Sequence, residues 1–173
     1  MYVKATWPPC AAAIAFVALA ASASAQQPQG VANPSIDMAG FLHVSAAAAA
    51  HRESRRVSEE EFLRLARMPG TVILDARSRE KYDELHIAGA INLSFPDIAI
   101  ESLRRTIPSR STRILIYCNN NFSGNESAFA SKLPAASLNL STYIALYTYG
   151  YRNVYELAPQ VDVAASILPF QGR

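Results

Sequence analysis

The sequence predicts an α/β fold built on a parallel β-sheet. Short apolar segments alternate along the chain with segments that suit helices, which is the order typical of parallel sheets. Two of the apolar segments, residues 72–74 and 114–117, are followed directly by polar side chains, Asp75 and Cys118. Ligand sites in such sheets lie at the carboxyl ends of the strands. We therefore expect Asp75 and Cys118 at one edge of the sheet.

The regular part of the chain is expected to begin near Val57. Ser58 and Glu61 have the spacing of a capping box, and an apolar stripe follows until residues 69–70, Pro-Gly, end the helix. Gly150 ends the last expected helix. Between these points the sequence predicts strands over residues 72–74, 90–93, 114–117 and 153–157, and helices over residues 78–85, 95–106, 128–133 and 142–149.

The N-terminal residues are typical of an export signal. Lys4 precedes an apolar run over residues 11–21, and residues 23–25 read Ala-Ser-Ala, a suitable cleavage site. The run is shorter than the roughly 20 apolar residues of a transmembrane helix. We predict a signal peptide over residues 1–25, a lead segment and N-terminal arm over 26–56, and a domain over 57–173. In the arm, Phe41 and Leu42 are expected to contact the domain.

The predicted localisation is periplasmic or secreted, in a bacterium. Of four Asn-x-Ser sequons, one lies in a motif expected to pack internally and two lie in the loop after Cys118; glycans there would be disruptive, which favours bacterial export over a eukaryotic secretory route. Cleavage removes Cys10, so Cys118 remains as a single cysteine that cannot form an internal disulfide. After cleavage we expect a monomer with no membrane span. The sequons lie at Asn92, Asn121, Asn125 and Asn139.

Charge and composition exclude some function classes. The formal net charge is +2 and no long basic run is present, so nothing favours nucleic-acid binding. His43, His51 and His86 do not have metal-ligand spacing with Cys118, and we predict neither a metal nor a cofactor. Arg52, Arg55 and Arg56 are expected to form a solvated face.

Cys118 is the strongest candidate for chemistry. It ends an apolar strand and precedes a polar loop over residues 119–127, which the expected helix over 128–133 follows. Loop amides and a helix N-terminus favour the thiolate, which is the nucleophilic form. The same pattern also suits a buried structural cysteine at a strand end. The local pattern alone leaves both interpretations open.

Several motifs together resemble the rhodanese family over roughly residues 57–157. They are Leu74-Asp75-Ala76-Arg77, the segment from His86 through Gly89 to Leu93, Ile116-Tyr117-Cys118, and the segment from Tyr149 to Tyr155. The resemblance implies a rhodanese fold, with helices on both faces of the parallel sheet. It also implies that Cys118 attacks a sulfane sulfur and carries it as a persulfide. The implied partners are a small sulfur donor and a thiol acceptor, or a protein.

The resemblance also assigns a substrate-binding loop, whose amides cradle the persulfide anion. This loop comprises Asn119, Asn120, Asn121, Phe122, Ser123, Gly124, Asn125, Glu126 and Ser127. Here Gly124 stands six residues after Cys118, so the loop is longer than in typical members. Glu126 occupies a position where the family often has a basic residue, and its carboxylate would repel thiosulfate.

These departures keep two other functions open. A non-catalytic rhodanese module would use the enlarged loop as a docking surface for a protein. Phosphatases and arsenate reductases share the fold and have longer loops, but they need a cation to stabilise the oxyanion. Residues 119–127 contain no Arg or Lys, so this activity is ranked last.

Three polar residues are expected to support the site. Asp75 is interpreted mainly as a brace for the loop that follows its strand, and less as a residue that orients the site. Arg77 either binds an anion or pairs with a nearby carboxylate. His86 lies in a tight-turn motif, where a structural hydrogen bond is favoured over general-base catalysis.

Overall fold

The computed structural model describes residues 33–173, so the predicted signal peptide and most of the lead segment lie outside the described residues. The chain divides into two units, one ending at Ile36 and the other spanning Asp37–Arg173. The described end of the first unit is a turn, in which the Ile36 amide donates to the Asn33 carbonyl. The second unit holds all the helices and strands described below.

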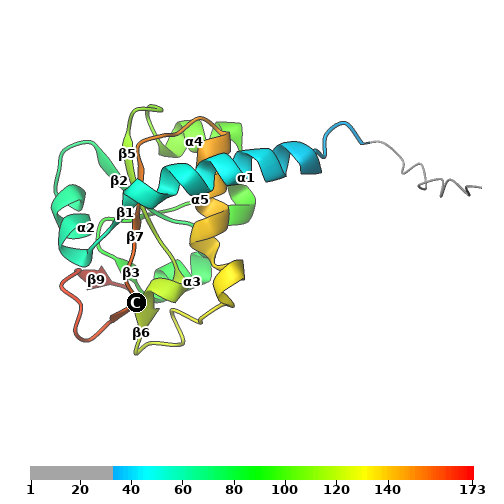
Figure 1. Ribbon diagram of the computed structural model, residues 1–173. Helices are drawn as coiled ribbons and strands as arrows, with labels where there is room; N and C mark the ends of the chain where they lie inside the picture. The colour runs from blue at the N-terminus through cyan, green and yellow to red at the C-terminus, as the bar shows by residue number, and fades with distance from the viewer. Residues whose placement is uncertain (1–32) are drawn as a thin grey trace, which may run out of the picture. The chain divides into compact units, whose positions relative to one another are not determined.

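A five-stranded parallel sheet forms the centre of the second unit (Figure 1). Its spatial order is β1-β7-β5-β2-β4, and every neighbouring pair is parallel. This confirms the predicted fold class and the predicted strands. The bounds are β1 (Arg56–Val57), β2 (Thr71–Asp75), β4 (Ile91–Asn92), β5 (Arg113–Tyr117) and β7 (Val154–Leu157).

Helices cover both faces of this sheet, because alternate strand residues point to opposite sides. Ile73, Leu115 and Leu157 pack with residues of α2 (Glu59–Ala66) on one face. Leu74, Ile116 and Val154 pack with α4 (Ile100–Thr106), α5 (Leu138–Thr148) and α1 (Met38–Arg52) on the other. Figure 1 shows α2 on one side of the sheet and α5 on the other. The helices are α1 (Met38–Arg52), α2 (Glu59–Ala66), α3 (Arg79–Glu84), α4 (Ile100–Thr106) and α5 (Leu138–Thr148), with short 3-10 turns η1 (Glu53–Arg55), η2 (Phe95–Asp97), η3 (Asn119–Asn121) and η4 (Pro134–Ala136).

Side-chain caps begin the first helices. Asp37 accepts from the Gly40 amide at the start of α1, and Ser58 accepts from the Glu61 amide at the start of α2. Ser78 likewise accepts from the Lys81 amide at the start of α3. The Ser58 and Ser78 caps confirm the helix starts that the sequence predicts.

The arm packs on the domain differently from the prediction. α1 lies against α5 through Ala48, which is buried, whereas Phe41 and Leu42 are both more than half exposed. Phe41 still lines a pocket with α5 residues such as Ile144, whereas Leu42 does not line it; the closest approach of the helix is made by its small residues. Arg52 and Arg55 do not form a solvated face either. Arg52 pairs with the buried carboxylate of Glu156, and Arg55 donates to the Tyr155 hydroxyl.

The predicted helix over residues 128–133 is absent, and α5 begins at Leu138, earlier than predicted. One isolated turn brings the Phe129 amide to the Asn125 carbonyl, and the chain is then extended until η4. Burial of Phe129 against Phe122 and hydrogen bonds between Lys132 backbone and the Asn120 side chain replace helical bonding. Pro134 then removes a further donor.

The C-terminal segment adds two small sheets outside the central one. β6 (Phe122–Ser123) pairs in parallel with β8 (Val161–Asp162), and β3 (His86–Ile87) pairs antiparallel with β9 (Phe170–Gln171). The first pairing ties the loop after Cys118 to the end of the chain. It therefore fixes a part of the molecule that the sequence predicts as an open loop.

Candidate active site around Cys118

Cys118 lies where the sequence places it, directly after β5 and beside the end of β2. Asp75, the last residue of β2, pairs in register with Tyr117. The thiol is covered, because Cys118 is only 1% exposed. Its Sγ lies 3.4 Å from the hydroxyl Oγ of Ser137, the residue that precedes α5. The helix start beside the sulfur is therefore that of α5.

Asn121 holds the backbone of the cysteine in place. Its Oδ1 accepts from the Cys118 amide at 2.9 Å and from Nδ2 of Asn139 at 3.0 Å. Its Nδ2 donates to the carbonyls of Leu157 and Pro159. Asn121 and Asn139 are both buried, so their side-chain nitrogens lie in internal bonds rather than at accessible sequons.

Much of the loop after Cys118 is committed to internal structure. Phe122 is buried and packs with Phe129 and Phe170. Gly124 has a φ of 79°, and a Cβ there would come within 3.0 Å of the Asp162 carboxylate, so only glycine fits. Asn125 Oδ1 accepts from the Ala128 amide. These contacts close the loop onto the domain.

The remaining residues of the predicted loop differ in exposure, and only Glu126 and Ser127 are exposed among them. Ser127 donates to the Glu84 carboxylate, Ser123 is half-buried, and Glu126 is exposed. The side chain of Asn120 reaches Lys132, donating to its carbonyl at 2.8 Å and accepting from its amide at 3.1 Å. Asn119 is buried beside a cavity that is described below.

Asp75 and Arg77 form one buried cluster with Tyr117. The carboxylate accepts from the Arg77 amide, from the Arg77 guanidinium, and from the Tyr117 hydroxyl at 2.6 Å. Burial, reinforced by the Asp75 charge, raises the pKa of Tyr117 well above its usual value, so the phenol stays protonated and donates. Arg77 also donates to the carbonyls of Ala128 and Leu85. The cluster thus joins the ends of two strands to the cysteine loop.

His86 occupies a structural position in the turn before β4. Its Nδ1 lies 2.6 Å from the Tyr82 carbonyl and its Nε2 lies 2.9 Å from Gln171. The ring stacks on Tyr82, with centroids 3.7 Å apart. Both ring nitrogens therefore have partners, which leaves this histidine little room for general-base work.

A cavity of about 440 Å³ lies next to the cysteine. Asn119, which follows Cys118, and Leu138, which follows Ser137, both line it. Two lysines also line it from outside the loop: Lys81 from α3, which pairs with Glu84 at 2.8 Å, and Lys132 from the segment before η4, which forms no ion pair among residues 33–173. Its lining comprises Ala76, Arg77, Ser78, Lys81, Ser94, Phe95, Pro96, Asn119, Ala130, Lys132 and Leu138. The cavity brings positive charge to the site even though residues 119–127 contain none.

Sequence reasoning missed four residues of this site. Lys81 and Lys132 lie outside the predicted loop, and Lys132 falls in the segment predicted as a helix, so the local pattern does not connect them with Cys118. Ser137 and Asn139 were overlooked because α5 was expected to begin at residue 142. A polar residue just before the apolar pattern of residues 138–146 was the available signal for Ser137.

Two further observations concern metal binding and membrane-spanning helices in residues 33–173. Among residues 33–173, no group of His, Cys, Asp and Glu side chains is arranged to hold a metal ion. In that same part of the chain, no helix combines the length and apolarity needed to cross a bilayer.

A thiol at the end of a central strand, held against the start of a helix in a parallel α/β domain, defines the class of site. The family model for the rhodanese-like domain matches residues 58–158. This is more than half of the chain, so the protein belongs to the rhodanese-like domain family. A search of curated proteins by sequence finds no match.

Solved structures similar to this chain come from several bacteria. The BH2092 protein from Bacillus halodurans shares 19% identity at a TM-score of 0.47, over 69% of this chain and 77% of that one. The rhodanese-like domain of the Alr3790 protein from Anabaena shares 23% identity at a TM-score of 0.47, over 69% and 80%. A thiosulfate sulfurtransferase from Pseudomonas aeruginosa shares 20% identity at a TM-score of 0.43, over 70% and 21%.

Proposed function

We propose that the protein carries sulfane sulfur as a persulfide on Cys118. The observation that carries this proposal is the position of Sγ at the sheet edge, against the Ser137 hydroxyl. The residues that follow Cys118 and Ser137 in the chain, Asn119 and Leu138, line a cavity that Lys132 also lines. Positive side chains attract an anionic sulfur donor. Family membership supports the same chemistry, as does the free cysteine at the strand end, the one cysteine among residues 33–173.

The transfer consists of two displacements at sulfur. The Cys118 thiolate attacks the outer sulfur of the donor, a new S–S bond forms, and the donor's S–S bond breaks with its electron pair leaving as sulfite or thiolate. An acceptor thiolate or cyanide then attacks the outer sulfur of the persulfide and returns the Cys118 thiolate. No net oxidation of the protein occurs, and the reaction is split into two easier steps.

Access to the sulfur requires local opening. We name residues 130–137 the connecting segment, since they join the cysteine loop to α5. Each residue from 130 to 136 is exposed, and two hydrogen bonds from Asn120 tie the segment to the loop. Segments with few buried contacts open at low free-energy cost. We infer that movement of the connecting segment uncovers Cys118 for the donor.

Intact-mass measurement tests the proposal. The full chain carrying Cys10→Ser, so that Cys118 is the single thiol, is incubated with glutathione persulfide and separately with thiosulfate. One added sulfur atom is expected, removable by cyanide or dithiothreitol, and Cys118→Ser in the same background should gain none. Turnover of p-nitrophenyl phosphate that is lost in Cys118→Ser would instead favour the phosphatase alternative.

A second function, a non-catalytic docking module, is favoured by the closed state of the site. Cys118 is 1% exposed, Asn121 and Phe122 are used internally, and Leu133 on the connecting segment is 79% exposed. An exposed leucine on a tied-down loop suits contact with a protein. An unchanged mass with every donor, together with a reactive thiol after denaturation, would support this function and contradict sulfur carriage.

We also propose that the protein is exported, on the basis of the sequence of residues 1–25. Expression of the full chain in a bacterium, followed by fractionation and N-terminal sequencing, tests this. A periplasmic product that begins at Gln26 is expected. An uncleaved product confined to the cytoplasm would contradict export.

A further inference from the structure

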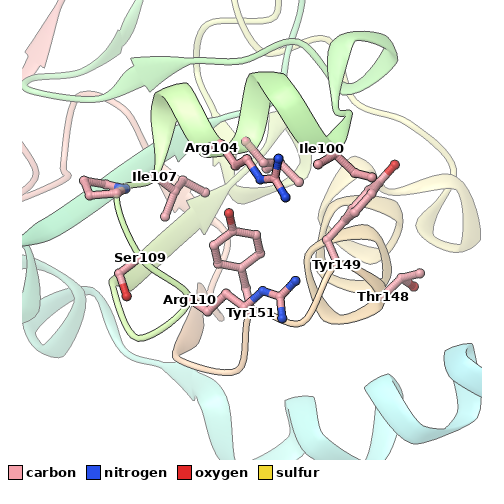
Figure 2. Close-up of a pocket in the computed structure, with 10 residues that line it drawn as sticks. Ile100, Arg104, Ile107, Ser109, Arg110, Thr148, Tyr149 and Tyr151 are labelled. Atoms are coloured by element: carbon pink, nitrogen blue, oxygen red, sulfur yellow. The ribbon is translucent and has the colours of Figure 1, made fainter.

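A second cavity, of about 480 Å³, is lined by ten residues (Figure 2). Its walls come from α4, from the loop before β5, and from the turn between α5 and β7. Both β5 and β7 begin beside it, whereas Cys118 follows the end of β5. Because the sheet is parallel, this cavity and the cysteine site lie at opposite ends of the same strands.

Two guanidinium groups supply the charge of this cavity, and no acidic residue lines it. Figure 2 shows the side chains of Arg104 and Arg110 reaching in from opposite walls. Arg104 pairs with Glu101 at 3.0 Å, but both side chains are about 70% exposed, and such pairs are weak. Arg110 forms no ion pair with any residue in the range 33–173. The cavity therefore carries uncompensated positive charge.

Gly150 makes room for one of these guanidinium groups. A Cβ at this position would lie 3.4 Å from Cζ and Nε of Arg110. Gly150 also has a φ of 90°, which favours glycine. The Arg110 side chain is thus packed over the turn backbone instead of extending freely into solvent.

Tyr151 provides a polar group whose position indicates a ligand site. Its side chain lines the cavity although the residue is only 5% exposed, and its hydroxyl has no hydrogen-bond partner among residues 33–173. The ring is buried but the hydroxyl is open to the cavity, so it is free to donate a hydrogen bond to a bound molecule. Apolar contact surface is close by, from Leu103, Ile107 and the ring of Tyr149.

We propose that this cavity binds a small aromatic oxyanion, with its acidic group between Arg104 and Arg110, a hydrogen bond from Tyr151, and its ring against the apolar wall. Guanidinium groups suit carboxylate, sulfonate and phosphate oxygens. The cavity volume is within the range of small-molecule sites. This site is separate from the proposed sulfur chemistry and does not depend on it.

Isothermal titration calorimetry of the full chain with phenyl phosphate tests the proposal. Saturable binding is expected, tighter than that of inorganic phosphate or phenol alone, and weaker at high salt. Arg104→Gln and Arg110→Gln should each weaken it roughly tenfold or more, because a charge-assisted bond is lost. Tyr151→Phe should weaken it several-fold at an unchanged melting temperature. Benzoate in place of phenyl phosphate shows whether a carboxylate is accepted.

Arg105→Gln is the matched control, since Arg105 is exposed beside Arg104 on α4 and does not line the cavity. It should bind as wild type does, and so should Cys118→Ser. The proposal would be overturned by an absence of saturable binding at millimolar concentration, by equal binding of inorganic phosphate, or by equal losses in Arg105→Gln and Arg104→Gln.

Discussion

Asp75 and Arg77 form an ion pair that is closed to solvent, with Nη2 2.6 Å from Oδ2 and neither side chain more than 1% exposed. The pair spans two residues of sequence and makes a compact turn after β2. Arg77 extends from this turn to the carbonyls of Ala128 and Leu85. The structure therefore favours the structural roles considered for both residues, with each serving as the other's counter-ion.

Replacing Asp75 with Ala should destabilise the fold strongly. We expect the free energy of unfolding to fall by roughly 3–5 kcal/mol, because Arg77 is left as an unpaired buried charge. Tyr117→Phe is the control, since it removes the hydrogen bond to the same carboxylate, and the weaker one from the Ile87 amide, without removing a charge; it should cost about 1–3 kcal/mol. Urea denaturation measures both. Unchanged unfolding of Asp75→Ala, with persulfide formation abolished, would assign Asp75 a catalytic role.

Alanine substitutions of Asn120 and Asn121 should differ in their effects on stability and on the reactivity of Cys118. Asn121→Ala removes four hydrogen bonds, three of them buried, and leaving even one buried group unpaired costs roughly 1–3 kcal/mol, so a large loss of stability is expected. Asn120→Ala frees only the exposed connecting segment, so it should change stability little while accelerating alkylation of Cys118. Melting curves and iodoacetamide kinetics in the Cys10→Ser background separate the two effects. Equal alkylation of Asn120→Ala and wild type would contradict gating by this segment.

Lys132 should affect the rate of reaction with anionic sulfur donors more than Glu126 does. Lys132 lines the cavity beside Cys118, whereas Glu126 is exposed and does not line it. Lys132→Gln should slow thiosulfate-dependent thiocyanate formation several-fold at low salt, and the difference should shrink as ionic strength rises. Its backbone bonds to Asn120 remain, so the segment keeps its position.

Glu126→Arg is the comparison for that measurement. It adds the charge type usual in the family, and a smaller gain in rate is expected from it. A gain from Glu126→Arg that exceeds the loss from Lys132→Gln would show that the loop position controls donor choice.

His51 should make the packing of α1 sensitive to acid. Its Nδ1 lies 2.8 Å from the Tyr143 hydroxyl, with Tyr147 against the ring. Burial lowers the pKa of His51 below 6.5, and the charges of Arg55 and Arg152 lower it further. The unfolded chain therefore binds a proton more readily than the folded one, so stability falls as the pH drops below about 6.5.

Substitution distinguishes the contribution of His51 to this pH dependence from that of His43. His51→Gln should flatten the fall in melting temperature between neutral pH and pH 5. His43→Gln, on the exposed face of the same helix, should leave it as steep as in wild type. If the two variants have identical pH profiles, His51 is not the group responsible.

The order of strands and helices follows from local features of the chain. The apolar segments that end in Asp75 and Cys118, and the caps at Ser58 and Ser78, depend on near neighbours alone, so the sequence predicts them. The prediction of a helix over residues 128–133 was wrong, because these residues contact partners that are distant in sequence. Phe129 packs on Phe170, and Lys132 is bonded to Asn120. Long-range burial overrides local propensity there.

The candidate site also has features that the sequence predicts and features that depend on tertiary packing. The sequence by itself determined that Cys118 ends a central strand in a rhodanese-like domain, since strand, cysteine and loop are contiguous. Only the tertiary structure decided that the thiol is covered, that Ser137 faces it, and that Lys81 and Lys132 supply charge beside it. The reason is physical: these residues come from different elements, and only the packing of β5, α3 and α5 brings them together.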